Sequence, residues 1–111
     1  MLPIAVKIEE YLEEDSSSPF AAWFGDLDAI AAAKVVVALA RIERGAVSNV
    51  KGVGEGVLEY RIDFGPGYRV YFGRDGETLV ILLAGGTKRR QDADIAAAKA
   101  RWTAYKARGK G

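Results

Sequence analysis

Cysteine and histidine are both absent from this chain of 111 residues. The lack of cysteine excludes a disulfide framework and a thiolate metal site, so the core alone must hold the domain together. The lack of histidine leaves Lys, Tyr, Asp and Glu as the side chains for acid–base chemistry. We therefore expect no metal and no cofactor. A cytoplasmic location is the simplest interpretation of a chain without cysteine.

A long apolar run is also missing. No segment approaches the ~20 apolar residues that span a bilayer, and Met1–Ile8 lacks the basic and apolar regions of a signal peptide. Half of the residues are hydrophobic and 28% are charged, which is typical of a soluble globular protein. At this length, we expect residues 1–111 to form a single domain around one hydrophobic core.

A large net charge is missing too. Sixteen Lys and Arg residues face fifteen Asp and Glu residues, and the net charge of +1 is weak evidence for a polyanionic partner. The distribution is uneven, because residues 1–28 hold seven acids and one base whereas residues 88–110 hold eight bases and two acids. The sequence therefore predicts an acidic beginning and a basic end.

Capping residues and apolar periodicity predict two successive helices. Ser18 followed by Pro19 is a typical helix start. Apolar residues then follow at helical spacing: Phe20, Trp23, Phe24 and Leu27. A longer helix is expected from about Asp28 to Arg44, where Gly45 supplies the usual stop. The two helices should form an αα-hairpin.

A final helix is expected from about Gln91 to Lys106. Its apolar stripe contains the following residues: Ile95, Ala98, Trp102 and Tyr105. We expect Trp102, like Trp23 of the first helix, to be a core residue.

The remaining pattern is that of β-strands. Alternation at Ile4, Val6 and Ile8 predicts a first strand. Three more strands are expected after the helices, joined by turns that contain glycine: Val57–Phe64, Tyr68–Gly73 and Thr78–Ala84. The order β-α-α-β-β-β-α predicts an α+β fold. It should have an antiparallel meander sheet, an αα-hairpin packed on one face, and a C-terminal helix.

Alternation along the strands assigns their side chains to opposite faces of the sheet. Glu59, Arg61 and Asp63 share one face of their strand, and Arg69 and Tyr71 share one face of the next. We therefore expect an apolar face that receives the helices and a polar face that carries chemistry. Residues 79–83 are continuously apolar, which predicts a central strand covered on both sides.

The segment from Val50 to Phe72, VKGVGEGVLEYRIDFGPGYRVYF, resembles the phage Gp49-like, HigB-like branch of the RelE/ParE toxins. The similarity continues through residues 85–88, Gly-Gly-Thr-Lys, and through the following positions: Gln91, Asp94-Ile95 and Ala98-Lys99. It is most specific between Lys51 and Lys88 and weakest in the first twenty residues. Within this segment, residues 52–56 are rich in glycine but lack the context of a dinucleotide-binding loop, so we interpret them as a flexible turn.

The resemblance implies a RelE-like fold and the toxin of a toxin-antitoxin system. Such a toxin is held inactive by a cognate antitoxin, which in this branch is often a helix-turn-helix repressor. Many relatives cleave mRNA on the ribosome, whereas ParE-like relatives inhibit DNA gyrase. We favour a metal-independent, ribosome-dependent mRNA endoribonuclease. A gyrase inhibitor and an inactive antitoxin-binding member are the alternatives.

RNA cleavage without a metal needs a general base, a general acid and cations that stabilise the phosphorane. The candidate catalytic residues are basic or phenolic: Lys51, Arg61, Arg69, Tyr71 and Lys88. Arg61 and Arg69 should act as a clamp on the phosphate, since guanidinium forks match phosphate oxygens. The alternative is that both arginines pair with Glu59 and Asp63 on a solvated face.

The roles of the other candidates stay open. Lys51 and Lys88 are each suited to act as the general base or as a phosphate ligand. Tyr71 is either a proton donor, a stacking platform for a base, or an ordinary cross-strand aromatic. Arg89 and Arg90 follow Lys88 and either contact the RNA backbone or form a solvated helix entrance.

Overall fold

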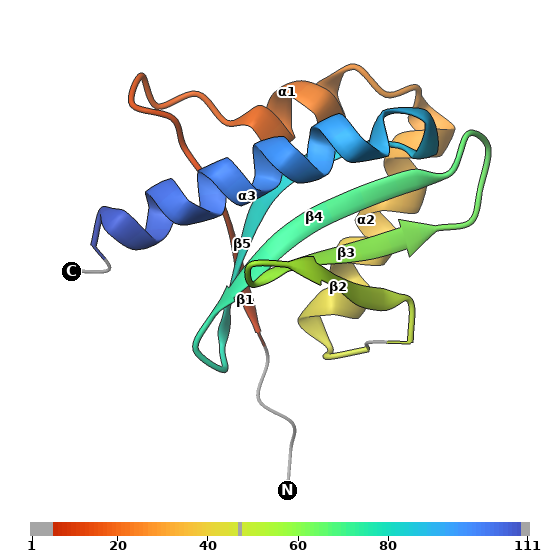
Figure 1. Cartoon of the computed structure of the whole chain (residues 1–111). Helices are drawn as coiled ribbons and strands as arrows, with labels where there is room; N and C mark the ends of the chain where they lie inside the picture. The colour runs from red at the N-terminus through yellow and green to blue at the C-terminus, as the bar shows by residue number, and fades with distance from the viewer. Residues whose placement is uncertain (1–5, 47, 110–111) are drawn as a thin grey trace, which may run out of the picture.

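The structure is a computed structural model that describes residues 6–46 and 48–109 of the chain. Its elements follow one another in this order: β1 (Lys7–Glu10), α1 (Pro19–Gly25), α2 (Ala29–Glu43), β2 (Val50–Gly54), β3 (Val57–Ile62), β4 (Tyr68–Asp75), β5 (Leu79–Thr87), a 3-10 helix η1 (Lys88–Arg90) and α3 (Gln91–Ala107). The chain is a mixed α+β protein with one five-stranded sheet (Figure 1). The prediction of an α+β fold is thus confirmed.

The predicted helices are present, and their starts have the expected chemistry. The hydroxyl of Ser18 accepts a hydrogen bond from the backbone N–H of Ala21 at 3.0 Å, which caps α1. The carboxylate of Asp28 does the same for Ala31 at 2.8 Å, which caps α2. These caps satisfy backbone donors that a helix leaves unpaired at its first turn.

The three predicted strands form an antiparallel meander, β3-β4-β5, but the sheet as a whole is mixed, which corrects the prediction of an antiparallel sheet. The strand order is β1-β5-β4-β3-β2, and β1 pairs with β5 in parallel while the other neighbours are antiparallel. A parallel pair needs a crossover connection, and α1 and α2 lie within the long connection that follows β1. Val6 and Ile8 lie in or beside this strand, whereas Ile4 lies outside the described residues.

The glycine-rich segment 52–56 is not simply a flexible turn, which is a second correction. Val50–Gly54 forms the edge strand β2, which pairs with β3 and carries a bulge between Gly52 and Gly54. Glu55 and Gly56, both with positive φ, form the tight turn into β3. Glycine weakens the strand signal in a sequence, but the backbone of β2 still pairs with its neighbour.

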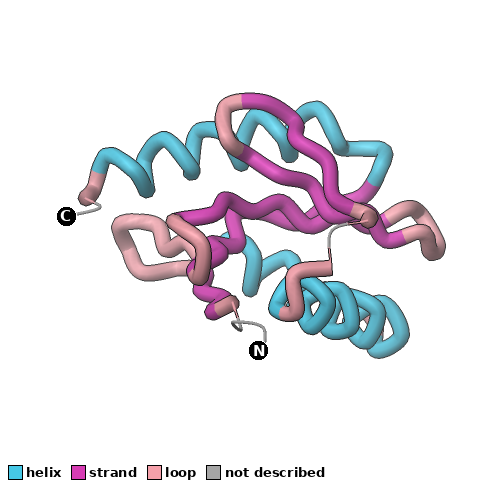
Figure 2. The backbone as a smooth tube through the Cα atoms, turned by 90° about the horizontal axis from the view of Figure 1, so that it is seen from below, coloured by secondary structure: helices cyan, strands magenta, loops and turns pink. Residues whose placement is uncertain are grey.

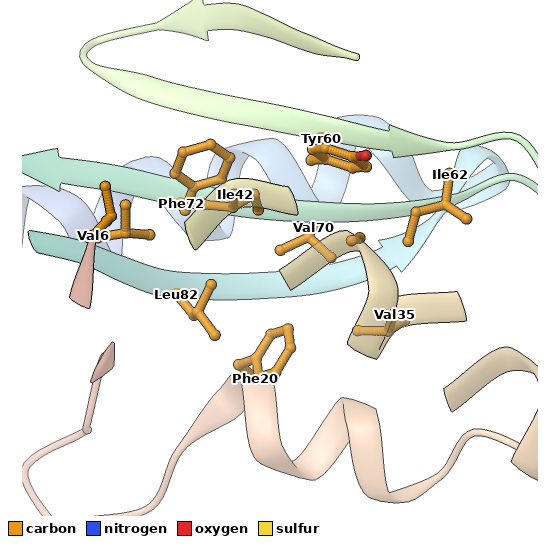
Figure 3. Packing of buried hydrophobic residues seen from close by; sticks show 11 residues of the cluster. Val6, Phe20, Val35, Ile42, Tyr60, Ile62, Val70, Phe72 and Leu82 are labelled. Atoms are coloured by element: carbon orange, nitrogen blue, oxygen red, sulfur yellow. The ribbon is translucent and has the colours of Figure 1, made fainter. Parts of the chain in front are cut away.

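Helices cover both faces of the sheet, as Figure 2 shows. On one face, α1 and α2 pack on a wholly hydrophobic cluster that includes Val35, Val70 and Leu82 (Figure 3). On the other face, α3 packs on a second cluster that includes Tyr71, Leu83 and Trp102. β5 contributes to both clusters, as expected for a central strand. Trp102 is a buried core residue, as predicted, whereas Trp23 is partly buried and packs against the first cluster.

The polar face expected to carry chemistry is therefore largely covered by α3, because the final helix docks on it. No helix within the described residues is long and apolar enough to cross a membrane.

Candidate functional site

A cavity of about 400 Å³ opens at the end of the sheet where β2, β3, β4 and η1 meet. Its wall contains four cationic residues, one from each of these elements: Lys51, Arg61, Arg69 and Lys88. Among the described residues that line it, Asp63 is the one acid. We call this cavity the cationic pocket. It brings together four of the five predicted catalytic residues, although they are up to 37 positions apart in the sequence.

The two arginines of the cationic pocket lie directly opposite each other. The register of β3 and β4 pairs Arg61 with Arg69. Like charges at directly opposed positions destabilise a sheet, so this pair is unfavourable for the fold. Arg61 is exposed, whereas Arg69 is only 3% exposed. The expectation that both arginines sit on an open polar face is therefore correct for Arg61 and wrong for Arg69, which α3 and η1 help to cover.

Arg69 is held by a buried network. Its Nε lies 3.8 Å from Oε2 of Glu59, whose side chain is 0% exposed, and its Nη1 donates a hydrogen bond to the carbonyl of Gly67 at 3.3 Å. Gln91, the first residue of α3, donates from Nε2 to the same Oε2 of Glu59 at 2.8 Å. Arg69 thus pairs with an acid, as the structural alternative held, but in the interior and not on a solvated face. The network fixes its guanidinium at the pocket wall.

Tyr71 is the predicted catalytic residue that does not line the cationic pocket. It is 0% exposed and belongs to the cluster under α3, where it lies across from Glu59 in the register of the two strands. Burial, followed by the negative charge of Glu59, raises the pKa of Tyr71 far above its ordinary value. A phenol in this setting neither reaches RNA nor releases its proton readily. Its position agrees with a structural cross-strand aromatic.

The predicted RNA-binding residues Arg89 and Arg90 lie just outside the cationic pocket. Both are exposed in η1, and they line a shallow depression that also includes Lys88. Lys88 therefore links the two surfaces. Other bases of the C-terminal region have different partners: Arg101 pairs with Glu13 at 3.6 Å, and Arg108 donates to the carbonyl of Leu12. Of these two contacts, the Arg101–Glu13 pair joins the basic end of the chain to an acid of its beginning, whereas Arg108 binds a neutral carbonyl.

Close packing of α3 on β5 explains the Gly-Gly pair that precedes Lys88. A Cβ on Gly86 would clash with the Asp94 carboxylate on α3, and a Cβ on Gly85 would clash with the Trp23 ring on α1. Burial raises the pKa of Asp94 above its ordinary value, although Arg90 and Arg101 oppose this rise. The two glycines let one helix approach each face of the strand.

Three further residues of the site were not among the predicted site residues, although Glu59 and Asp63 were considered as partners of the two arginines. Asp63 lines the cationic pocket, whereas Glu59 and Gln91 support Arg69 from behind. The alternation of apolar and polar residues along the strand placed Glu59 on the same face as Arg61. It did not indicate that the Glu59 carboxylate is buried. Gln91 belongs to the segment that carries the family resemblance, and that was the one available signal for it.

Comparison with known proteins identifies the family. Residues 22–103 match the family model described as phage-derived protein Gp49-like (DUF891). The chain belongs to the Gp49-like family. This is a RelE-like, toxin-like family, so the broad resemblance seen in the sequence is confirmed. The matched residues include the whole cationic pocket and most of α3.

A relative of this Gp49-like protein occurs in Haemophilus influenzae. It is 43% identical over 81 residues, which cover 72% of this chain and 82% of the relative, and it is described as an uncharacterised protein. It therefore adds no activity.

Proposed function

We propose that this Gp49-like protein is the toxin of a type II toxin-antitoxin system and cleaves mRNA on the ribosome without a metal. The cationic pocket is the observation that carries the proposal. Four cations facing one acid form a site for a polyanion, and the opposed arginines are unfavourable for the fold unless they serve a ligand. Membership of a toxin-like family supports the same conclusion.

The proposed reaction is an internal transesterification. The 2′-oxygen of a ribose attacks the adjacent phosphorus, the bond from phosphorus to the 5′-oxygen breaks, and a 2′,3′-cyclic phosphate and a 5′-hydroxyl result. The proton of the 2′-hydroxyl passes to a base, and the departing 5′-oxygen takes up a proton. Lys51 and Lys88 are the candidates for proton transfer, and their two roles stay open. Arg61 and Arg69 stabilise the charge on the phosphorane.

The rigidity of Arg69 supports this division of roles. A guanidinium fixed by Glu59 and Gly67 stabilises developing charge without having to reorganise during the reaction. Arg61 is exposed and can follow the phosphate as it enters. The outer residues Arg89 and Arg90 bind the RNA backbone beside the scissile phosphate.

The partners follow from this proposal: mRNA on the ribosome in the cytoplasm, and a cognate antitoxin that silences the toxin. We favour steric cover of the pocket by an amphipathic antitoxin helix over direct charge capture, because the net charge of +1 creates little long-range attraction. Affinity for the antitoxin should then change little with salt.

Induction of the protein in cells, followed by mapping of transcript 5′ ends, tests the proposal. We expect new 5′ ends inside translated messages, and their loss in the Lys51→Ala, Lys88→Ala double variant. Lys7→Ala is the matched control, because Lys7 lies on β1, at the opposite edge of the sheet from β2. A gyrase supercoiling assay run beside it covers the main alternative. If growth stops without new transcript 5′ ends and the protein inhibits supercoiling by gyrase, the proposal is overturned in favour of a gyrase inhibitor.

A further inference from the structure

A second cavity, of about 280 Å³, adjoins the cationic pocket. The two cavities share four lining residues: Asn49, Arg61, Ile62 and Asp63. They are therefore neighbouring compartments, and a chain bound in one can continue into the other. We call the second cavity the side slot. It lies between α2 and the end of β3. The residues of α2 that line it take no part in the proposed reaction.

The side slot combines an apolar lining with cations. The apolar contribution comes from four residues of α2 and β3: Val37, Ala38, Tyr60 and Ile62. Lys34 and Arg41, both exposed on α2, add positive charge beside Arg61. Asn49 and Asp63 supply polar groups. Apolar side chains, cations and a few hydrogen-bonding groups are suited to a nucleotide with its base and phosphate.

Phe64 provides an aromatic ring at this site. It lines the side slot directly after β3 and remains 37% exposed, in contrast to the buried aromatic residues Phe20 and Phe72. The ammonium of Lys34 lies 4.8 Å from the centre of its ring. The ammonium therefore lies over one face of the ring. A base that stacks on this face displaces Lys34, whose charge is then available to the phosphate.

We propose that the side slot binds a nucleotide of single-stranded RNA that flanks the scissile phosphate. Its base stacks on Phe64, and its phosphate is bound by Lys34 and Arg41. This inference rests on the proposed function, because it treats the cationic pocket as the place of cleavage. It assigns substrate binding to residues of α2 that are not among the predicted catalytic residues.

A protein partner is the competing occupant of this region, because α2 also exposes Ile30, Val36 and Val37. RNA is favoured for the side slot itself by its three cations and by its continuity with the cationic pocket. A protein helix would instead use the apolar residues along α2 and would gain little from a compartment that opens into the pocket.

The test is the affinity of the full chain for a short fluorescein-labelled RNA, measured by anisotropy. All 2′-hydroxyls of the RNA are methylated, so that binding is separated from cleavage. Phe64→Ala should weaken binding about fivefold or more, as loss of a stacked base does, and Phe64→Tyr should retain it. Phe64→Leu keeps apolar bulk without a ring and should bind as weakly as Phe64→Ala. Leu12→Ala, a change of another exposed apolar residue outside the side slot, should bind like wild type.

The salt dependence of RNA affinity provides a second test. Lys34→Gln should lower the slope of log affinity against log salt by about 0.7, the value for one phosphate contact to a single strand. Lys7→Gln, the same charge change at the far edge of the sheet, should leave the slope unchanged.

Wild-type affinity and slope in both Phe64→Ala and Lys34→Gln would overturn the inference, even if wild type cleaves RNA in cells. RNA affinity that is unchanged in these variants while antitoxin affinity falls would assign the surface to the protein partner. Weaker RNA binding by these variants, together with absence of cleavage by wild type in cells, would confirm the side slot as an RNA-binding site and overturn the proposed reaction.

Discussion

The face of the sheet under α1 and α2 and the face under α3 are built on different principles. The first is an apolar core throughout, from Val6 to Leu82. The second is apolar around Trp102, but toward the cationic pocket it buries charged and polar groups: Glu59, Arg69, Gln91 and Asp94. One sheet therefore uses one face for stability and the pocket end of the other to hold a cation in place.

The comparison shows how a small chain can hold a cation in place at the wall of a cavity. Four buried atoms near the N-terminal part of α3 lack a well-formed hydrogen bond within the described residues: Glu59 Oε1, Arg69 Nε, Tyr71 Oη and Asp94 Oδ2. Unsatisfied buried polar atoms cost stability, and proteins retain them mainly at functional sites. The apolar face supplies the stability that this arrangement requires.

The largest effect should come from separating the buried pair. Arg69→Ala leaves the Glu59 carboxylate buried without its cation, which should cost about 3–5 kcal/mol of unfolding free energy. Arg61→Ala, at the directly opposed and exposed position, should change the unfolding free energy by only about 0.5 kcal/mol or less, because it also removes the repulsion between the two arginines. Urea unfolding of both variants measures the contrast.

Replacing both members of the pair supplies the control. The Glu59→Leu, Arg69→Met double variant should recover most of the stability, because an apolar pair removes both desolvated charges. Equal urea midpoints for Arg69→Ala and Arg61→Ala would show that the buried network does not distinguish the two arginines.

A smaller effect is expected where α3 touches β5. Gly86→Ala should cost about 1–3 kcal/mol, because its Cβ would overlap the Asp94 carboxylate. Gly52→Ala, with no atom within 4 Å of its added Cβ, should be nearly neutral. Thermal unfolding compares the two, and adding Asp94→Ala to Gly86→Ala should restore part of the loss. No difference between the two glycines would contradict the close approach of α3.

The pH dependence of stability should reveal the charge buried at Asp94. Burial raises its pKa from 3.8, so its contribution to stability is present below that value and is lost as pH rises through the folded pKa. Asp94→Asn should therefore be more stable than wild type at neutral pH, by less than about 1 kcal/mol because the group is partly exposed. The difference should vanish in acid. A destabilised Asp94→Asn at neutral pH would mean that Arg90 and Arg101 outweigh burial.

The smallest effect should come from Tyr71→Phe. Removal of a buried hydroxyl that lacks a well-formed hydrogen bond should change stability by about 0.5 kcal/mol or less. Growth inhibition on induction should be unchanged, because Tyr71 is not in the cationic pocket. A folded but harmless Tyr71→Phe would return this tyrosine to the catalytic set.

Local signals in the sequence predicted most of the fold. Caps at Ser18 and Asp28 located two helix starts, and alternation located β3 and β4. β2 was missed because glycine hides a strand whose stability comes from its neighbour. The parallel pairing of β1 was missed because strand order depends on contacts distant in sequence.

The sequence predicted four residues that line the cationic pocket, but it did not predict how deeply each one is buried. Arg61 and Arg69 have the same pattern in the sequence, yet one is exposed and the other buried. Period-two alternation tells which side of a strand a residue occupies. It does not tell which part of that side a helix will cover, since this depends on where α3 docks. The burial of Glu59 and Tyr71 could not be predicted for the same reason.

The chemistry of the RNA ends tests the central claim most directly. Purified full-length protein is incubated with ribosomes translating a defined mRNA, and the 3′ ends of the fragments are analysed. The account predicts 2′,3′-cyclic phosphate ends, produced by wild type and Lys7→Ala and absent with the Lys51→Ala, Lys88→Ala double variant. Fragments ending in 3′-hydroxyls, or cyclic phosphates produced equally by the double variant, would contradict it.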